Sequence, residues 1–229
     1  MRPVNKGPSP QTHYQAYPDA LDDLAARLGL YCSYCEQPIS HAPEVEHVQP
    51  KSLVPALATA WSNFLLGCKT CNTIKGKQPV TPTTTAFPDQ DNTFRALTYL
   101  PDAQITVQST MPRQQTDLIQ ATIDLVRLDR HPTNRLQRDR PGRRDKRADF
   151  RKDVWDEAVR TLDYYQQEPN NPVLSDMIIK LAQAKGFFSV WMTVFQDHPA
   201  MLNRFIAAFP GTDRASFDAR GHPVQRGRL

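Results

Sequence analysis

Hydrophobic residues at intervals of three and four positions predict helices in two parts of the chain. Near the start, the apolar residues of "DALDDLAARL" share one face of a short helix, and Gly29 ends it. Beyond residue 113 the same spacing returns. Two helices there have the apolar faces Leu118, Ile119, Thr122, Leu125, Val126 and Phe150, Val154, Ala158, Leu162, Tyr165. Two further helices that meet at Gly186, and a last one in "AMLNRFIAAF", complete a predicted helical domain at 111–229.

The middle of the chain shows strand patterns instead. The alternation in "EVEHV" and the apolar run in "NFLLGC" predict two strands, and "TCNTIKGK" predicts a short helix after them. Residues 78–92, rich in Pro and Thr, form a linker or an extended wrap. "TFRALTYL" and "AQITVQS" are predicted to pair as a hairpin within 80–110. The expected fold is therefore α+β, mainly α: an N-terminal arm and helix (1–30), a small module (31–79) and the helical domain.

Charge and composition narrow the functional classes. No apolar run approaches the roughly 20 residues that span a bilayer, and "MRPVNKGPSPQTHYQ" lacks the apolar stretch of a signal peptide, so we expect a cytoplasmic protein. The net charge is only +4, but residues 127–152 hold eleven Lys and Arg against four Asp. This basic run is interpreted as a DNA-tracking strip, a solvated loop or a partner-docking surface.

The four cysteines form two matched pairs. Cys32 and Cys35 make one C-x-x-C motif, and Cys68 and Cys71 make a second. Cytosolic thiols stay reduced, so a disulfide framework is not expected. Two such turns together supply the tetrahedral, all-thiolate set of a structural Zn²⁺ site, which leaves no open position for chemistry. A redox role fits less well, because no thioredoxin-like βαβ pattern surrounds either pair.

The residues between and after these pairs carry a second pattern. An acid and a histidine stand in the first strand, an asparagine precedes the second, and an asparagine and a lysine follow the last cysteine. This order resembles the HNH endonucleases, the zinc-clipped ββα-metal nucleases. The matching positions are Cys32, Cys35, Glu46, His47, Asn63, Cys68, Cys71, Asn72 and Lys75.

The resemblance implies DNA cleavage and a role for each matching residue. His47 would be the general base, and its ordinary pKa of about 6.5 leaves much of it neutral at cellular pH. Glu46 and Asn72 would hold one catalytic Mg²⁺ or Mn²⁺ through oxygen atoms. Asn63 would fix the loop that orients His47. The family more often has Asp at the position of Glu46 and His at that of Asn72, but both substitutes keep an oxygen donor.

Several other residues are candidates for contact with nucleic acid. The basic side chains Lys51, Lys75 and Lys77 flank the motif, and Arg143 and Arg144 lie in the basic run. Each has the alternative of being an ordinary solvated charge. Trp61 and Phe64 are interpreted as core residues of the small module and not as base-stacking groups.

A wider resemblance extends over most of the chain. "MRPVNKG", "FPDQDNTFRALTY", "GFFSVWMTVF" and "FPGT" resemble the HNH proteins of bacterial anti-phage operons, the Septu-type PtuB proteins and their retron-associated relatives. That resemblance implies an ABC/AAA-like, PtuA-like ATPase partner. "GFFSVWMTVF", apolar nearly all round, is either a buried core helix or a face reserved for that partner. The alternative function is a catalytically degenerate zinc module that binds nucleic acid or the ATPase without cleaving.

Overall fold

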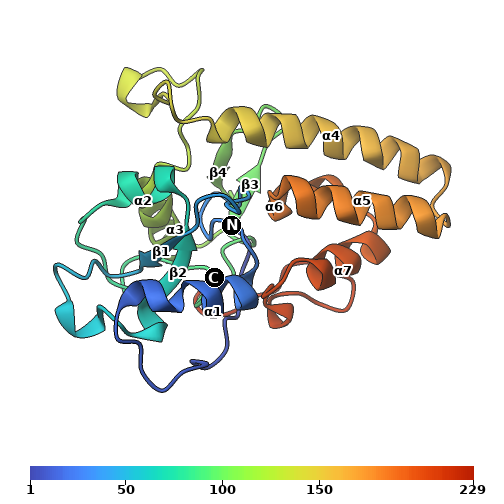
Figure 1. Ribbon diagram of the computed structural model, residues 1–229. Helices are drawn as coiled ribbons and strands as arrows, with labels where there is room; N and C mark the ends of the chain where they lie inside the picture. The colour runs from blue at the N-terminus through green and yellow to red at the C-terminus, as the bar shows by residue number, and fades with distance from the viewer.

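The helices predicted from the hydrophobic pattern all form in the computed structural model, which describes residues 1–229 (Figure 1). The α-helices are α1 (Leu21–Leu28), α2 (Lys69–Lys75), α3 (Arg113–Val126), α4 (Arg147–Gln167), α5 (Pro172–Lys185), α6 (Phe188–Val194) and α7 (Pro199–Ala208). Gly29 and Gly186 follow the last residues of α1 and α5, each with a positive φ that favours glycine. The predicted break at Gly186, between α5 and α6, is therefore confirmed.

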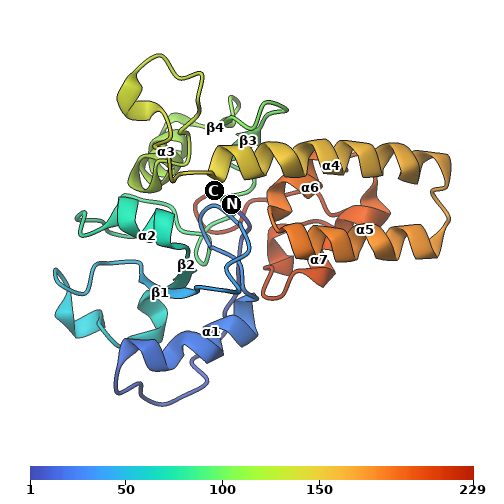
Figure 2. The same ribbon diagram turned by 45° about the horizontal axis from the view of Figure 1, so that its top comes forward.

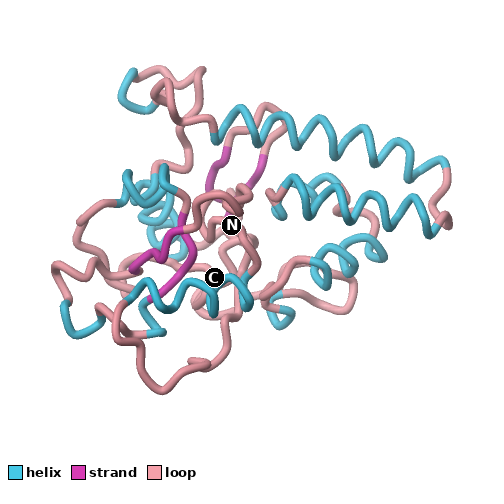
Figure 3. The backbone as a smooth tube through the Cα atoms, viewed as in Figure 1, coloured by secondary structure: helices cyan, strands magenta, loops and turns pink.

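Two small antiparallel sheets complete the mixed α/β fold. Strand β1 (Glu44–His47) pairs with β2 (Phe64–Gly67), and β3 (Leu97–Tyr99) pairs with β4 (Ile105–Val107), as the two predicted hairpins require. In the first sheet Glu44 lies opposite Gly67. Helix α2 begins two residues after β2, so residues 44–75 form a ββα unit. Figure 3 shows that loops join most of these elements.

The ββα unit and the helices α4 to α7 lie on opposite sides of the chain's first residues (Figures 1 and 2). The backbone of Val4 bridges that of Thr212, and Arg2 donates a hydrogen bond to the carbonyl of Leu28 at 2.7 Å. A single cluster of 48 buried hydrophobic residues runs through both sides. The N-terminal segment therefore forms part of the core. No helix combines the length and the apolar character needed to cross a membrane.

Residues 78–92 follow the wrap prediction. Ala86 and Phe87 are fully buried, and the Thr122 hydroxyl of α3 donates to the Ala86 carbonyl at 2.7 Å. The buried part of this segment, residues 85–88, thus packs against α3 as part of the core, while Thr81, Thr83 and Thr84 are exposed.

Two predictions about helical faces need correction. Phe150, placed on the buried stripe of α4, is 50% exposed, because the start of that helix turns two arginines inward, Arg147 and Arg151. Both find carbonyl acceptors inside the protein. The partner-docking alternative for "GFFSVWMTVF" is wrong, since six of its side chains are buried: Phe187, Phe188, Val190, Trp191, Met192 and Phe195.

The turn at Gly186 generates a stability prediction. Its φ is +70°, and a Cβ there would lie 2.6 Å from the carbonyl oxygen of Glu36. We expect Gly186→Ala to lower the free energy of unfolding by about 1–3 kcal/mol through backbone strain, before any cost of the clash. Urea denaturation followed by circular dichroism measures the change. Gly142→Ala is the matched control, because nothing lies within 4 Å of its added Cβ, and an unchanged midpoint in Gly186→Ala would contradict the argument.

Candidate functional site

The four cysteine side chains meet at one buried point. Their sulfur atoms all lie within 4.8 Å of one another, and the Sγ atoms of Cys35 and Cys68 are 3.7 Å apart. A tetrahedral zinc ion with bonds of about 2.3 Å sets its sulfur ligands roughly 3.8 Å apart. The cluster therefore has the donor chemistry and the size of a structural zinc site.

Local backbone geometry brings each pair of cysteines to this point. Cys68 is the N-cap of α2, where its sulfur accepts a hydrogen bond from the amide of Cys71 at 3.3 Å. In the first pair, the amide of Glu36 donates to the Cys32 carbonyl at 2.9 Å, and the Ser33 amide donates to Leu66 of β2 at 2.8 Å. The first turn is thereby fixed to the strand that leads into the second.

Glu36, directly after Cys35, connects the cluster with α6. The residue has a φ of +67° and is buried. Its carboxylate accepts hydrogen bonds from the Ser189 amide at 3.0 Å and hydroxyl at 2.6 Å, and its carbonyl accepts from the Phe187 amide at 2.9 Å. An acid that caps the start of a helix is stabilised by the N–H groups there. Sequence reasoning missed this role, because nothing near Cys35 indicates contact with a helix residue 153 positions away.

A separate cleft of about 200 Å³ lies beside the strands. Glu46, His47 and Asn72 all line it, together with Lys51 and Lys77. Strand β1 supplies the first two side chains and α2 supplies the third. The structure therefore brings together three of the four residues predicted to be catalytic, and the fourth, Asn63, is not among the residues that line the cleft.

Hydrogen bonding fixes the tautomer of His47. Its Nε2 lies 3.0 Å from the carbonyl oxygen of Ala58, and a carbonyl can only accept, so Nε2 carries the hydrogen and the neutral ring has its lone pair on Nδ1. Tyr17 and Phe64 pack edge-on against the ring at centroid distances of 5.0 and 5.3 Å. Burial lowers the pKa of His47 against the effect of the Ala58 bond, and the positive charge of Lys51 lowers it further. The ring is therefore held neutral, with Nδ1 as its basic atom.

Glu46 is a buried carboxylate with a buried counter-ion. The residue is 2% exposed, and the Lys75 ammonium lies 2.8 Å from its Oε1. The Tyr34 hydroxyl donates to the same oxygen at 3.3 Å, which leaves Oε2 without a hydrogen-bond partner. Burial raises the pKa of Glu46 to about 7, while the charge and hydrogen bond of Lys75 act to lower it. Lys75 thus favours the ionised form that can bind a cation.

Lys75 differs from the other lysines near the motif in being buried. The side chain is 2% exposed and also donates to the His47 carbonyl at 2.6 Å. It also lines the cleft, so it lies beside Glu46 beneath the surface and is not an exposed cation. Of the other two lysines predicted to touch nucleic acid, both are exposed, and the Lys51 ammonium lies 3.6 Å from the centre of the Tyr17 ring.

Asn72 is oriented by an acid that the sequence reasoning missed. Its Nδ2 donates to Oε2 of Glu44 at 2.5 Å, and a carboxylate can only accept, so Oδ1 faces away from Glu44. No protein group donates to that oxygen. A Cβ at Gly67 would stand 3.2 Å from the Cβ of Glu46 and 3.8 Å from that of Asn72. Because glycine has no side chain, Glu46 and Asn72 can both lie close to the backbone of β2 at this position. The second acid in "EVEH" was the available signal, since alternate strand residues share a face.

Asn63 holds the loop that ends at Ala58. Its Oδ1 accepts from the Gln49 amide at 2.8 Å, and its Nδ2 donates to the carbonyls of Gln49 at 2.9 Å and Leu57 at 3.2 Å. Because Ala58 follows Leu57 and binds His47, the amide of Asn63 acts on the histidine indirectly. Trp61 and Phe64, interpreted as core residues, are buried.

The basic run proves to have two kinds of arginine. Arg143 and Arg144 are exposed in the loop between α3 and α4, and neither forms an ion pair. In contrast, the side chains of Arg147 and Arg151 are buried. The basic run is therefore not one continuous exposed strip: two of its arginines are buried, whereas the side chain of Lys152, beyond them, is 44% exposed.

A hairpin and helix clipped by four cysteines, with an acid, a histidine and an amide at one cleft, define a ββα metal-binding unit. Residues 32–78 match the family model of the HNH endonucleases. The match begins at the first cysteine and ends three residues after α2, so it contains the cysteine cluster and every residue predicted to be catalytic. No curated protein matches the chain.

The cysteine cluster leads to a prediction about metal content. We expect Cys68→Ser to lose the zinc ion and to unfold the ββα unit, because metal affinity at such a site is folding free energy. Elemental analysis measures the zinc, and proteolysis of residues 32–78 measures the unfolding. Thr73→Ser, an exposed change in the same helix, should retain one zinc ion. A soluble Cys68→Ser protein with full zinc content would contradict the four-cysteine site.

Proposed function

We propose that this protein is an HNH endonuclease that hydrolyses DNA phosphodiester bonds with one divalent metal ion and His47 as general base. One observation carries the proposal. His47, Glu46 and Asn72 line a single cleft, and the Nδ1 atom of His47 has no hydrogen-bond partner in the protein. Two oxygen atoms of the other side chains, Oε2 of Glu46 and Oδ1 of Asn72, also accept no hydrogen bond from the protein. A base next to two hard oxygen donors is the set that phosphodiester hydrolysis needs.

The proposed reaction assigns each side chain one task. His47 accepts at Nδ1 a proton from the water that attacks phosphorus, while its Nε2–H bond to Ala58 keeps the ring in place. Glu46 and Asn72 hold the ion, and their oxygen ligands favour Mg²⁺ or Mn²⁺. When bound, that ion stabilises the charge that builds on the scissile phosphate and the leaving oxygen. Asn63 positions the loop, and Glu44 positions Asn72.

DNA contacts are also proposed for four exposed cations, two at the cleft and two in the loop between α3 and α4. Lys51 and Lys77 line the cleft, where they would flank a bound phosphate. Arg143 and Arg144 are free of acidic partners and supply sequence-independent attraction to the backbone. The substrate in this proposal is double- or single-stranded DNA read with little sequence preference.

We further propose that the nuclease is the effector of a bacterial anti-phage system of the Septu or retron type, restrained by an ABC/AAA-like ATPase. The support is the resemblance of segments outside residues 32–78, among them "MRPVNKG" and "FPGT". The ATPase would have to use exposed residues, since α6 lies inside the core. Co-expression with the product of a neighbouring ATPase gene, followed by co-purification and phage infection, tests this part independently of cleavage.

The general base generates the central prediction. We expect His47→Ala to lower plasmid cleavage in Mg²⁺ or Mn²⁺ by about 10²–10⁴-fold, the usual contribution of a positioned general base. Supercoiled plasmid is incubated with wild type and variant, alone and with the ATPase, and the nicked product is measured. His41→Ala is the matched control, because that histidine is exposed and lies outside the cleft.

Two outcomes would overturn the assignment. Equal cleavage by wild type and His47→Ala would remove His47 as base. Binding of DNA or of the ATPase by a wild-type protein that cuts under neither condition would favour the alternative of a degenerate zinc module.

The exposed arginines give a separate prediction. We expect Arg143→Gln/Arg144→Gln to weaken DNA binding and to reduce the slope of log affinity against log salt by about 2, one for each lost phosphate contact. Fluorescence anisotropy over a range of salt concentrations measures both. Arg160→Gln/Arg220→Gln removes the same charge from exposed positions outside the basic run and should leave the slope unchanged. If the first pair changed only binding to the ATPase, the loop would be a docking surface.

A further inference from the structure

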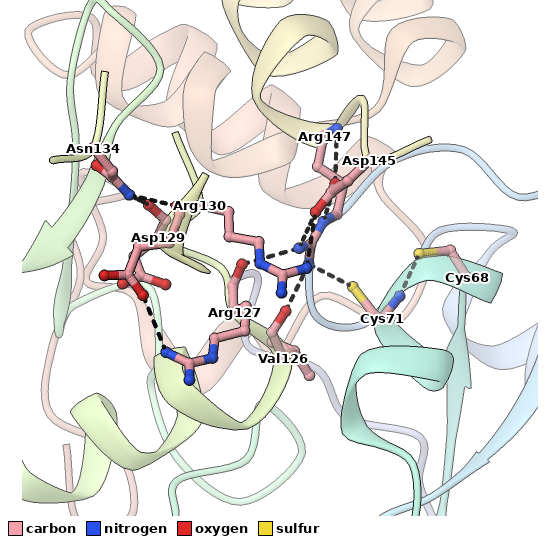
Figure 4. A network of polar contacts seen from close by, with 10 residues as sticks. Cys68, Cys71, Val126, Arg127, Asp129, Arg130, Asn134, Asp145 and Arg147 are labelled. Carbon is pink, nitrogen blue, oxygen red and sulfur yellow. Dashed lines mark hydrogen bonds and ion pairs between the residues drawn. The ribbon is translucent and has the colours of Figure 1, made fainter. Parts of the chain in front are cut away.

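The guanidinium of Arg147 is the centre of a buried polar network (Figure 4). Its Nη1 lies 3.3 Å from the Cys71 sulfur and 2.8 Å from the carbonyl of Val126, and its Nη2 donates to the carbonyl of Arg127 at 2.9 Å. Nε and Nη2 each donate to one oxygen of Asp145 at 2.8 Å. The side chain is 4% exposed, so these contacts replace water.

The contact between Arg147 and the Cys71 sulfur balances charge at the cysteine cluster. Four thiolates around one Zn²⁺ carry a net charge of −2, and a buried charge is costly unless it is paired. Asp145 neutralises part of Arg147, but Asp145 also lies 3.8 Å from Arg130, so the three side chains together present net positive charge. Hydrogen bonds from a cation to a thiolate are of the stronger, charge-assisted kind. Arg147 therefore supplies the compensation that the cysteine cluster needs on this side.

The same guanidinium fixes the two ends of the loop between α3 and α4. The carbonyls of Val126 and Arg127 belong to the C-terminal end of α3, where the orphan acceptors of a helix need donors. Arg147 itself is the first residue of α4. Within the loop, Asn134 donates to the carbonyls of Asp129 at 3.0 Å and Asp139 at 2.7 Å. Arg147 thus connects both ends of the loop to the cysteine cluster.

We infer that Arg147 is an outer residue of the four-cysteine metal site, which donates a hydrogen bond to the metal-bound Cys71 thiolate and ties that site to the base of the basic loop, residues 127–146. The inference concerns the structural metal and does not depend on DNA cleavage. It makes Arg147 a positioning residue with two measurable effects. One is on the electronic state of the Cys71 thiolate, and the other is on the order of the loop.

The first effect is tested with Co²⁺ in place of zinc. Arg147→Gln removes the positive charge and shortens the side chain, so the Cys71 sulfur becomes more electron-rich. The sulfur-to-cobalt charge-transfer absorption should then shift to longer wavelength. Outer partners of metal ligands typically change metal affinity 10- to 100-fold, so zinc transfer to a chromogenic chelator should accelerate by about that factor. A structural change elsewhere would not move the absorption band. An unchanged band and unchanged transfer rate in a folded variant would overturn the contact to Cys71.

The second effect is tested by hydrogen exchange of zinc-loaded protein. Arg147→Gln should speed amide exchange in residues 127–146 and leave α5 unchanged. Arg135→Gln is the matched control, since it removes an exposed arginine from the same loop that contacts neither Asp145 nor the sulfur. Equal exchange in the loop for wild type and Arg147→Gln would overturn the coupling.

A third variant keeps both tests decisive if Arg147→Gln does not fold. Arg147→Lys keeps the charge, but an ammonium cannot reach the sulfur, the aspartate and two carbonyls as the planar fork does. We expect Arg147→Lys to shift the absorption band to longer wavelength and to speed exchange in the loop, relative to both wild type and Arg135→Gln. Wild-type values in Arg147→Lys for both measurements would contradict the need for the fork.

Discussion

The convergence of four cysteine sulfurs on one buried point is the constraint on which the rest of this structure depends. Each cysteine turn is bonded to another part of the chain. After the first turn, Glu36 caps α6 through Ser189, and on the second, Cys71 receives a hydrogen bond from Arg147 of α4. A metal ion that closes the cluster therefore fixes two loops of the ββα unit and also the approach of the helical side. Small units with short strands need such a clip, because their own core is limited.

Buried charges in this protein are handled in the same way at both candidate metal sites. At the cleft, the ammonium of Lys75 lies 2.8 Å from Glu46, and at the cysteine cluster Arg147 lies 3.3 Å from Cys71. In each case a buried cation favours the ionised form of a metal-binding group at a place where burial favours the neutral form. Each cation also donates to backbone carbonyls, so it orients the surrounding chain as well as balancing charge.

The predicted elements formed because their signals are local. Helical spacing and the glycines after α1 and α5 predicted where these helices end. The strand patterns around Glu46 predicted the hairpin of β1 and β2. The errors share a different cause. Phe150 was assigned to a buried stripe by its hydrophobicity alone, whereas neighbouring arginines with internal acceptors occupy the buried face. Lys75 was interpreted as a surface charge because sequence does not report the depth of a residue.

The sequence by itself determined which donor atoms the protein possesses and in what order: two cysteine pairs, an acid beside a histidine, and an asparagine after the last cysteine. Spacing within a turn or a strand sets such groups through the short-range geometry of the backbone. Only the tertiary structure decided which charges are buried and which partners they meet. Arg147 and Cys71 are 76 positions apart, and Glu36 and Ser189 are 153. Contacts at such separations follow from packing of the whole chain, and no local pattern encodes them.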